Sequence, residues 1–166
     1  MELVVATGIA TLVCFIVSGV WISAIWSYDR TNSQTIADTD AALAMQEMIA
    51  DVREAKSVQV VTSDHLRIVF PMKNPDGTYN RTVPDTSNPV DYILSDSSGV
   101  VGRTGTWLWR EPTNGISRAI SRKVGSLVFE SDTPKSVAIT VSTRNNYTRG
   151  QAQTSLTERV VYLRNY

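Results

Sequence analysis

The pattern of hydrophobic and polar positions divides the chain near residue 56. No charged residue occurs from Leu3 to Tyr28. At about 1.5 Å per residue, a helix of this length would span the roughly 30 Å hydrocarbon core of a membrane. Trp21, Trp26 and Tyr28 lie toward the end of the run, where amphipathic rings favour the membrane interface. Residues 1–28 are therefore predicted to form a transmembrane-length helix.

The helical pattern continues beyond the apolar run. Residues 31–56 contain neither Pro nor Gly, and the polar residues between the apolar ones place a solvated face opposite an apolar stripe. The members of the stripe recur at helical spacing and are Ile36, Leu43, Met45, Met48, Ile49, Val52 and Ala55. We expect one helix of about 55 residues, with 29–56 as its amphipathic half, and a local break at Asn32 and Ser33 stays open.

Short β-branched or aromatic runs, several of them alternating in polarity, fill the chain after residue 56. They occupy residues 58–63, 66–70, 90–95, 106–110, 117–121, 126–131, 136–142 and 157–165. Turn residues separate the runs, including Asn145 and Asn146, and residues 71–90, with four of the six prolines, are expected to form an exposed loop. Residues 57–166 are therefore predicted to form an antiparallel sheet that covers the apolar stripe, which gives an α+β fold.

Charge is distributed unevenly although the net charge is zero. Residues 1–56 hold three Lys or Arg against seven Asp or Glu, whereas residues 57–166 hold thirteen against nine. This asymmetry is typical of a solvated surface, and it would also orient the molecule against copies of itself or acidic partners.

Small and aromatic residues within the apolar run are candidates for helix packing. Small side chains let helix backbones approach closely, and the only cysteine lies in the run, where a lone thiol behaves as a small hydrophobe. A lipid-facing anchor would also tolerate small residues. The predicted packing positions are Gly8, Cys14, Gly19, Trp21 and Trp26.

The sequence gives little support for catalysis or for a metal site. His65 is the only histidine, and Asp64 beside it would point to the opposite face of a strand, so a turn or strand-edge histidine is favoured over a dyad. Asn74, Asp76 and Asn80 could contribute to a calcium loop, but their spacing lacks the acids of an EF-hand and favours a plain turn. No phosphate-binding glycine motif occurs, and we predict no catalytic residue, metal or cofactor.

Two further groups of side chains have both a structural interpretation and a functional one. Basic residues around Tyr147 and near residue 120 could contact nucleic acid, but on a neutral protein they are typical of a solvated face; they are Arg118, Arg122, Lys123, Arg144 and Arg149. Trp107 and Trp109 share one side of a predicted strand, which indicates core packing or, as the alternative, a subunit interface.

The N-terminus resembles the type IV pilin-like superfamily. Mature chains of that family begin Phe-Thr-Leu-x-Glu-Leu, and Met1, Glu2 and Leu3 match the last three of those positions before VVATGIATL continues in the family's manner. The resemblance implies that Glu2 pairs with the N-terminal amine of a neighbouring subunit during assembly. A carboxylate in an apolar environment is costly, and an opposite charge from the next helix would offset that cost. A carboxylate resting in the aqueous headgroup layer is the alternative.

The rest of the chain is most similar to the J-type minor pseudopilins of type II secretion and related minor pilins. The similar stretches are DVREAKSVQV (51–60), YILSDSSGVVGRTG (92–105), VGSLVFE (124–130), SVAITV (136–141) and VVYLRN (160–165). The resemblance implies a non-enzymatic filament subunit with a spine helix, stored in the inner membrane and then assembled into a periplasmic pseudopilus or an extracellular pilus. A minor tip or initiation subunit is favoured over a major one.

The resemblance also implies the partners. These are other pilin or pseudopilin subunits, a separate assembly ATPase and a platform protein, while DNA binding is disfavoured. Methylation of the N-terminus is typical of the family, and the true mature N-terminus stays open. A second hypothesis is a single-pass membrane protein whose periplasmic β-domain binds a ligand or an envelope component and never polymerises. An envelope enzyme is a third, disfavoured because no nucleophile and base converge in the sequence.

Overall fold

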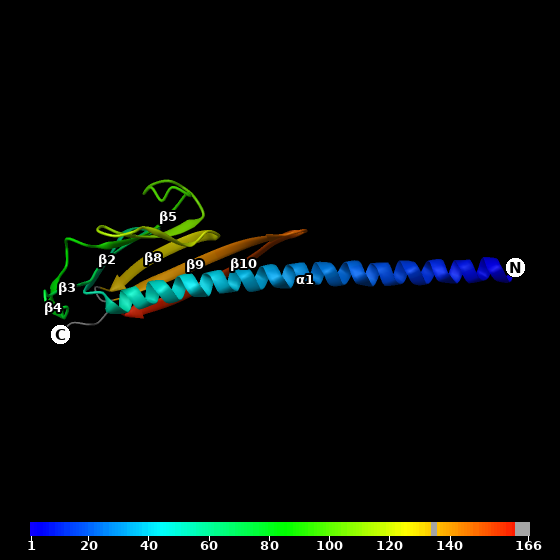
Figure 1. The fold of residues 1–166 in the computed structure, drawn as a ribbon, viewed down its shortest axis with the longest axis horizontal. Coiled ribbons are helices and arrows are strands. Elements are labelled where there is room, and N and C mark those ends of the chain that lie inside the picture. Colours follow the sequence, from blue (N-terminus) through cyan, green and yellow to red (C-terminus); the bar gives the residue numbers. More distant parts are fainter. Residues whose placement is uncertain (134–135, 162–166) are drawn as a thin grey trace.

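The computed structural model describes residues 1–133 and 136–161. The helix α1 (Glu2–Glu54) runs for 53 residues and leads into a domain built from strands. One part of α1 lies against this domain and the other part extends away from it, with the N-terminus at the far end (Figure 1). The chain therefore has the predicted α+β architecture, a long apolar N-terminal helix followed by an antiparallel β-domain.

The helix is continuous through Asn32 and Ser33, so no local break separates its halves. Ser33 is buried, and its hydroxyl donates to the backbone oxygen of Asn146 over 3.4 Å. The helix ends where Ala55 takes an extended conformation, with φ −64° and ψ 143°. The Lys56 N–H then donates to the oxygen of Val69 over 2.8 Å, which passes the chain directly into the first sheet.

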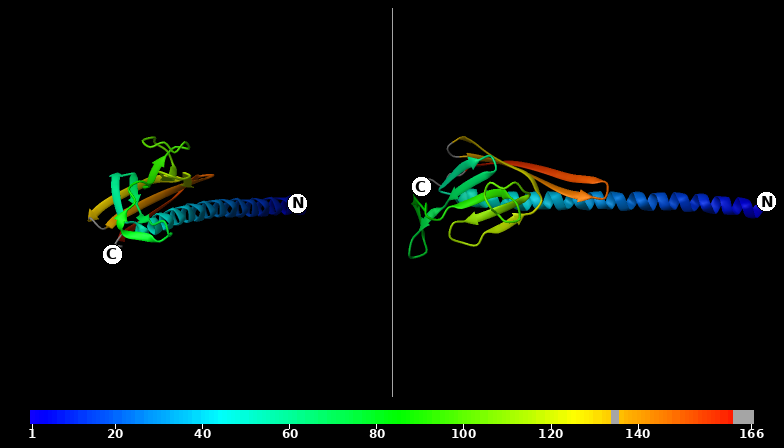
Figure 2. Two further views of the ribbon diagram at one scale, coloured as in Figure 1. Left: turned by 60° about the vertical axis from the view of Figure 1, so that its left-hand side comes forward. Right: turned by 90° about the horizontal axis from the view of Figure 1, so that it is seen from above.

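Two antiparallel sheets and a separate hairpin make up the domain. The five-stranded sheet has the order β1-β2-β5-β6-β7, with β1 (Ser57–Thr62), β2 (His65–Val69), β5 (Val90–Ser95), β6 (Trp107–Pro112) and β7 (Arg118–Ser121). The three-stranded sheet has the order β10-β9-β8, with β8 (Val124–Thr133), β9 (Ser136–Tyr147) and β10 (Gly150–Val161). Strands β9 and β10 run alongside α1 (Figures 1 and 2). Residues 162–165 of the last predicted strand lie outside the described residues.

Two sequence predictions about turns are wrong. Asn145 and Asn146 lie inside β9, and the chain reverses after Tyr147 instead. Residues 71–90 are not a plain loop, because β3 (Pro71–Lys73) and β4 (Tyr79–Pro84) pair as a hairpin. Pro71 and Pro84 face each other at its base, where the missing N–H groups do not interrupt a longer ladder. Gly77 supplies the positive φ, 86°, that its tip requires.

The apolar stripe of the helix is confirmed at its C-terminal end and wrong further back. Leu43 is 58% exposed and Ile36 is only half-buried, whereas the other stripe residues are buried in the core as predicted, namely Met45, Met48, Ile49, Val52 and Ala55. The side chains that lie against β9 and β10 instead are small, namely Ser33, Ala37, Ala41 and Ala44. The approach is close enough for the Thr143 hydroxyl to donate to the Ala37 backbone oxygen over 2.6 Å.

Substitution of Ala41 by Leu tests this close approach. Ala41 is fully buried, so the larger side chain has to displace the three-stranded sheet or adopt a strained rotamer. We expect the free energy of unfolding to fall by about 1–3 kcal/mol, measured by urea denaturation of the full chain in detergent micelles. Ala42→Leu is the control because Ala42 is exposed on the same helical turn. Equal effects of the two substitutions would contradict the packing described here.

The tryptophans of β6 do not lie in the core. Trp107 and Trp109 share one face as predicted, but the face is the outer one, and Leu108 between them is the buried residue. Their rings stack on each other at 5.8 Å between centroids, with the guanidinium of Arg122 4.7 Å from the centre of the Trp107 ring. The indole N–H of Trp109 donates to the backbone oxygen of Asp96 over 2.9 Å. This hydrogen bond holds the loop between β5 and β6 against the outer face of the sheet.

Candidate assembly surface on the N-terminal helix

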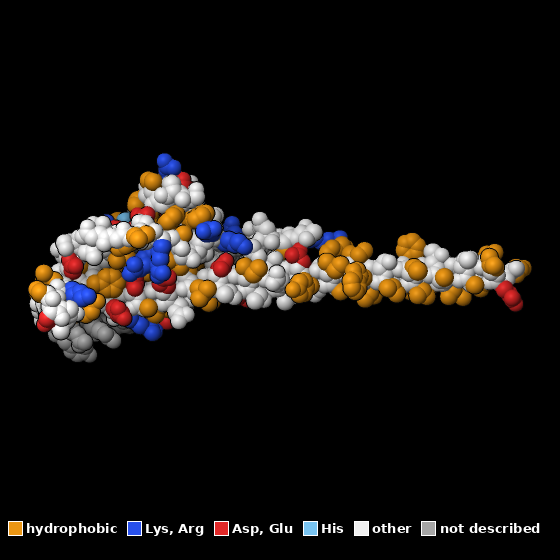
Figure 3. All heavy atoms as spheres, in the orientation of Figure 1, with side chains coloured by type: hydrophobic (Ala, Val, Ile, Leu, Met, Phe, Trp, Pro, Cys, Tyr) orange, Lys and Arg blue, Asp and Glu red, His pale blue; other side chains and the backbone are white. Residues whose placement is uncertain are grey.

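Within residues 1–133 and 136–161, no other segment covers the N-terminal part of α1. Nearly every residue up to Tyr28 is exposed, and hydrophobic side chains follow one another along this part of the helix (Figure 3). None of the residues in its uncharged apolar run is buried. The helix is therefore long and apolar enough to cross a membrane. An apolar surface of this extent has to be covered by lipid or by other helices.

The predicted assembly residues occupy the very start of this surface. Met1 caps the helix, and its backbone oxygen accepts from the Val5 N–H over 3.3 Å. Glu2 lies in the first turn, where a carboxylate interacts favourably with the helix dipole, and Leu3 follows with an exposed side chain. An acidic side chain projects from the end of the helix furthest from the β-domain (Figure 3), and Glu2 is the one acid before Asp29.

The predicted packing residues lie on two faces of the helix. At about 100° per residue, Gly8, Gly19 and Trp26 fall on one face, whereas Cys14 and Trp21 fall together roughly a third of a turn away. A side chain built at either glycine would meet nothing within 4 Å. No contact within one chain therefore requires glycine at these positions, which leaves one face with two narrow points where another helix backbone could approach.

The turn between β9 and β10 contacts the helix where the exposed part begins, through Thr148 and Arg149, and we call these contacts the clamp. The backbone N–H and the hydroxyl of Thr148 both donate to Asp29, over 2.8 and 2.6 Å. These hydrogen bonds hold the pKa of the Asp29 carboxyl below its ordinary value. The guanidinium of Arg149 lies 3.0 Å from the centre of the Trp26 ring, which is only 37% exposed. Sequence reasoning missed this clamp, because its two halves are far apart in the chain.

A second polar cluster fixes the other end of the helix to the five-stranded sheet. One carboxylate oxygen of Asp51 accepts from the Tyr92 hydroxyl and from Arg110 Nε, each over 2.7 Å. Glu47, one turn earlier, pairs with Arg118. Burial, and then the charge of Asp51, raise the pKa of Tyr92 far above its ordinary value, so the phenol stays a hydrogen-bond donor. The domain is thus attached to the helix at both ends.

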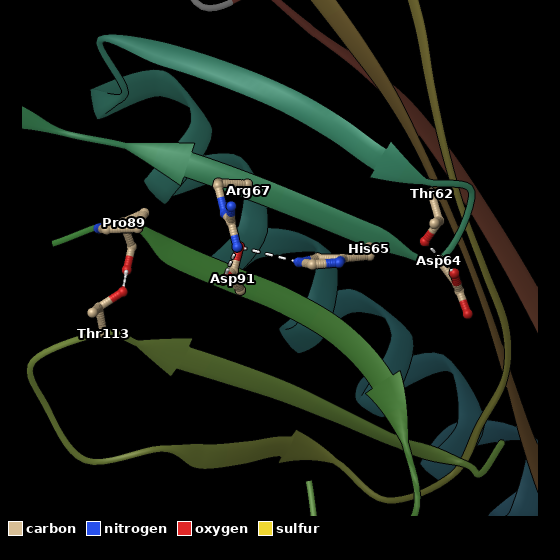
Figure 4. A network of polar contacts seen from close by, with 7 residues as sticks. All are labelled: Thr62, Asp64, His65, Arg67, Pro89, Asp91 and Thr113. Carbon is tan, nitrogen blue, oxygen red and sulfur yellow. Dashed lines mark hydrogen bonds and ion pairs between the residues drawn. The ribbon is translucent and has the colours of Figure 1, made fainter. Parts of the chain in front are cut away.

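His65 is neither a turn histidine nor part of an edge strand. It opens β2, which lies between β1 and β5, and its buried ring points to Asp91 and not to Asp64 (Figure 4). Nε2 lies 3.1 Å from Asp91 Oδ1, within ion-pair distance. Arg67 donates twice to the same carboxylate, over 2.8 and 3.0 Å. Burial would raise the pKa of Asp91, but Arg67 and His65 outweigh it and hold that pKa below its ordinary value.

The candidate calcium residues lie at the tip of the β3–β4 hairpin and at the start of β4. Asp76 accepts from the N–H and hydroxyl of Thr78, and Asn74 donates to the same hydroxyl. The Asn80 side-chain oxygen accepts from the N–H and hydroxyl of Thr82, and both residues lie in β4. Across residues 1–133 and 136–161, no three His, Cys, Asp or Glu side chains lie close enough together to hold a metal ion.

The basic residues considered for nucleic acid do not form one group. Arg118 forms an ion pair with Glu47 on the helix, away from the other basic residues. Arg144 lies beside Lys123, since the Arg144 N–H donates to the Lys123 backbone oxygen over 2.9 Å, and Arg122 precedes Lys123. Together with Arg149 at the clamp, these exposed cations lie on the part of the domain from which the bare helix leaves.

The fold and these contacts define a class, a membrane-length helix attached at two points to an antiparallel β-domain. Searches of protein-family models, curated proteins and solved structures each find no match to the chain.

Proposed function

We propose that the chain is a structural subunit of a type IV pilus or a type II secretion pseudopilus. One observation supports this proposal above the others. A single unbroken helix carries a β-domain on one part and leaves the other part bare, with a carboxylate at its free end. The bare helix suits storage in a membrane, and the same surface suits packing among copies of the helix in a filament core.

The transfer from lipid to filament does not depend on the hydrophobic effect. Lipid tails and apolar side chains solvate the helix about equally well, so assembly relies on close packing and on polar pairs between helices. Gly8 and Gly19 allow backbones to approach on one face, and Glu2 offers the one charged side chain in the apolar end of the helix. Pairing of Glu2 with the amine of a neighbouring subunit would set the axial register of the helices.

A minor subunit at the tip or the start of the filament is favoured over a major subunit. The resemblance of the strands to J-type pseudopilins supports this preference. The bitopic alternative, an anchored β-domain that binds a ligand, draws on a different feature. A hollow of about 570 Å³ lies between the end of the helix and the β3–β4 hairpin, and it is lined by Asp51, Lys56, Phe70, Tyr79, Asp85 and Arg110 among others.

Quantitative mass spectrometry of sheared surface filaments and of the membrane fraction tests the proposal. We expect the chain in the filament fraction, with a processed N-terminal peptide, at a trace level relative to the main subunit. Dominance of the filament fraction would make it a major subunit. Its presence only in membranes, with an unprocessed N-terminus, would reject the filament role in favour of the bitopic protein.

A further inference from the structure

The exposed cations at the helix exit form a basic collar on the domain. The basic collar is defined here as Arg30, Arg122, Lys123, Arg144 and Arg149. All five residues are exposed, and no member forms an ion pair with an acid among the described residues. Lys and Arg side chains are visible at the point where the free part of the helix leaves the domain (Figure 3). Asp29 lies among them, but its carboxylate accepts from Thr148.

The position of the collar along the helix follows from two contacts. Thr148 bonds to Asp29, and Thr143 bonds to the backbone of Ala37, so the strand between them runs beside residues 29–37 of α1. At about 1.5 Å per residue this interval is about 12 Å. Arg144 and Arg149 lie in or next to this interval, and Lys123 is tied to it through its bond to Asn145 over 2.6 Å.

A bilayer around the apolar run would bring charged headgroups to the same level. The headgroup layer adds about 5–8 Å beyond the hydrocarbon core, and electrostatic attraction extends for about 8 Å at physiological ionic strength. The collar begins where the uncharged run ends, at Tyr28. Its members therefore lie within the range at which anionic headgroups attract them.

The length of the apolar run favours contact on one side. From Leu3 to Tyr28 the helix spans about 39 Å, which exceeds the roughly 30 Å hydrocarbon core, and excess length is commonly taken up by tilting. The domain cannot swing freely on its helix, because the clamp at Asp29 and the cluster at Asp51 hold it at both ends. A tilt of the helix therefore lowers one side of the domain toward the membrane.

We infer that the basic collar docks on anionic phospholipid headgroups and fixes the orientation of the β-domain on the membrane. The inference requires only that the helix lie in a bilayer. Its test is therefore independent of whether the chain assembles into filaments. Each cation near an anionic surface shifts the balance between docked and lifted orientations by about fivefold. Loss of two cations is thus expected to lower this ratio on the order of tenfold or more.

The test uses the full chain reconstituted in lipid nanodiscs. A dye is attached at Ser126→Cys in a Cys14→Ser background, because Ser126 is exposed and follows Gly125, over which the Arg144 side chain lies. Spin-labelled headgroups quench the dye when the collar is docked. We expect several-fold stronger quenching in phosphatidylcholine–phosphatidylglycerol discs than in pure phosphatidylcholine, and loss of the difference at high salt.

Charge reversal at two sites provides the matched comparison. The collar variant Lys123→Glu with Arg144→Glu should return quenching to the level of pure phosphatidylcholine. The control Lys56→Glu with Lys73→Glu makes the same change in net charge at the end of the domain near the hairpin, and it should leave quenching unchanged. The comparison of lipids and salt concentrations on the chain without the Glu substitutions tests the inference even where a variant fails to fold.

Three results would overturn the inference. Quenching that is independent of phosphatidylglycerol would show that lipid charge does not position the collar. Equal effects of the collar and control variants on quenching would show that the net charge of the chain matters and that the position of the collar does not. The third result has two parts: quenching does not change with lipid composition, and copies of the collar variant cross-link to each other less than copies of the unreversed chain. Together these would show that the collar is a contact between subunits.

Discussion

Replacement of Glu2 by Ala is expected to leave the chain folded in the membrane and to remove it from filaments. Glu2 lies in the first turn of α1, and the described contacts of the β-domain do not involve it. In the proposed assembly its carboxylate pairs with the amine of a neighbour. The Ala variant leaves that amine as an unpaired charge. A charge at the bilayer centre costs about 2.5–3.5 kcal/mol, and the cost near the end of the helix is smaller, so we expect incorporation to fall on the order of tenfold.

The measurement is the ratio of the chain in sheared filaments to that in membranes, read beside a melting curve of the purified protein. Glu2→Gln separates charge from shape and should be nearly as defective as Ala. The matched control is Glu54→Ala, which removes the same side chain from the opposite end of the same helix. Normal incorporation of Glu2→Ala would remove the assembly role of Glu2. A lower membrane level of the variant would point instead to a role in insertion.

The long helix was predictable from sequence because its signals are local. An uncharged apolar run, the absence of Pro and Gly from residues 31–56, and a stripe at helical spacing each depend on neighbours in the chain. The prediction that the apolar stripe includes Leu43 was wrong for a physical reason. Where β9 and β10 approach the helix backbone, only small side chains fit, and Ala37 and Ala41 are not recognised as core residues by their hydrophobicity.

The strands were predicted less completely than the helix. The interiors of the two sheets follow β-branched and aromatic runs, whereas β9 and β10 extend into polar sequence such as Thr143 and Gln151. There, the pairing of two long strands against the helix decides the structure. The β3–β4 hairpin was missed because prolines normally argue against strands, and these stand only at its base.

The polar contacts that fix the helix could not be predicted from sequence. Asp29 and Thr148 are separated by more than a hundred residues, and Asp51 meets Tyr92 and Arg110 from two different strands. Helical spacing indicated only that such acids lie on the polar face. The structure shows that the face is partly covered, and that its acids are the points of attachment.

Replacement of Asp51 by Ala is expected to have the largest effect on the stability of the domain. Its side chain is 18% exposed and that of Arg110 is 24% exposed, while Tyr92 is fully buried. Removal of the carboxylate leaves a largely covered cation and a buried hydroxyl that both donated to it. We expect the free energy of unfolding to fall by about 3 kcal/mol, measured by urea denaturation of the full chain in detergent micelles.

The control is the pair of Arg53 with Glu158, two residues further along the same helix. These side chains lie 3.7 Å apart but are 64% and 46% exposed, so Arg53→Ala should cost less than about 1 kcal/mol. The triple variant Asp51→Leu, Tyr92→Phe, Arg110→Met removes both donors with the acceptor, and it should recover much of the lost stability. A small loss for Asp51→Ala, comparable to that of Arg53→Ala, would mean that water replaces the carboxylate and that apolar packing alone attaches the helix to the five-stranded sheet.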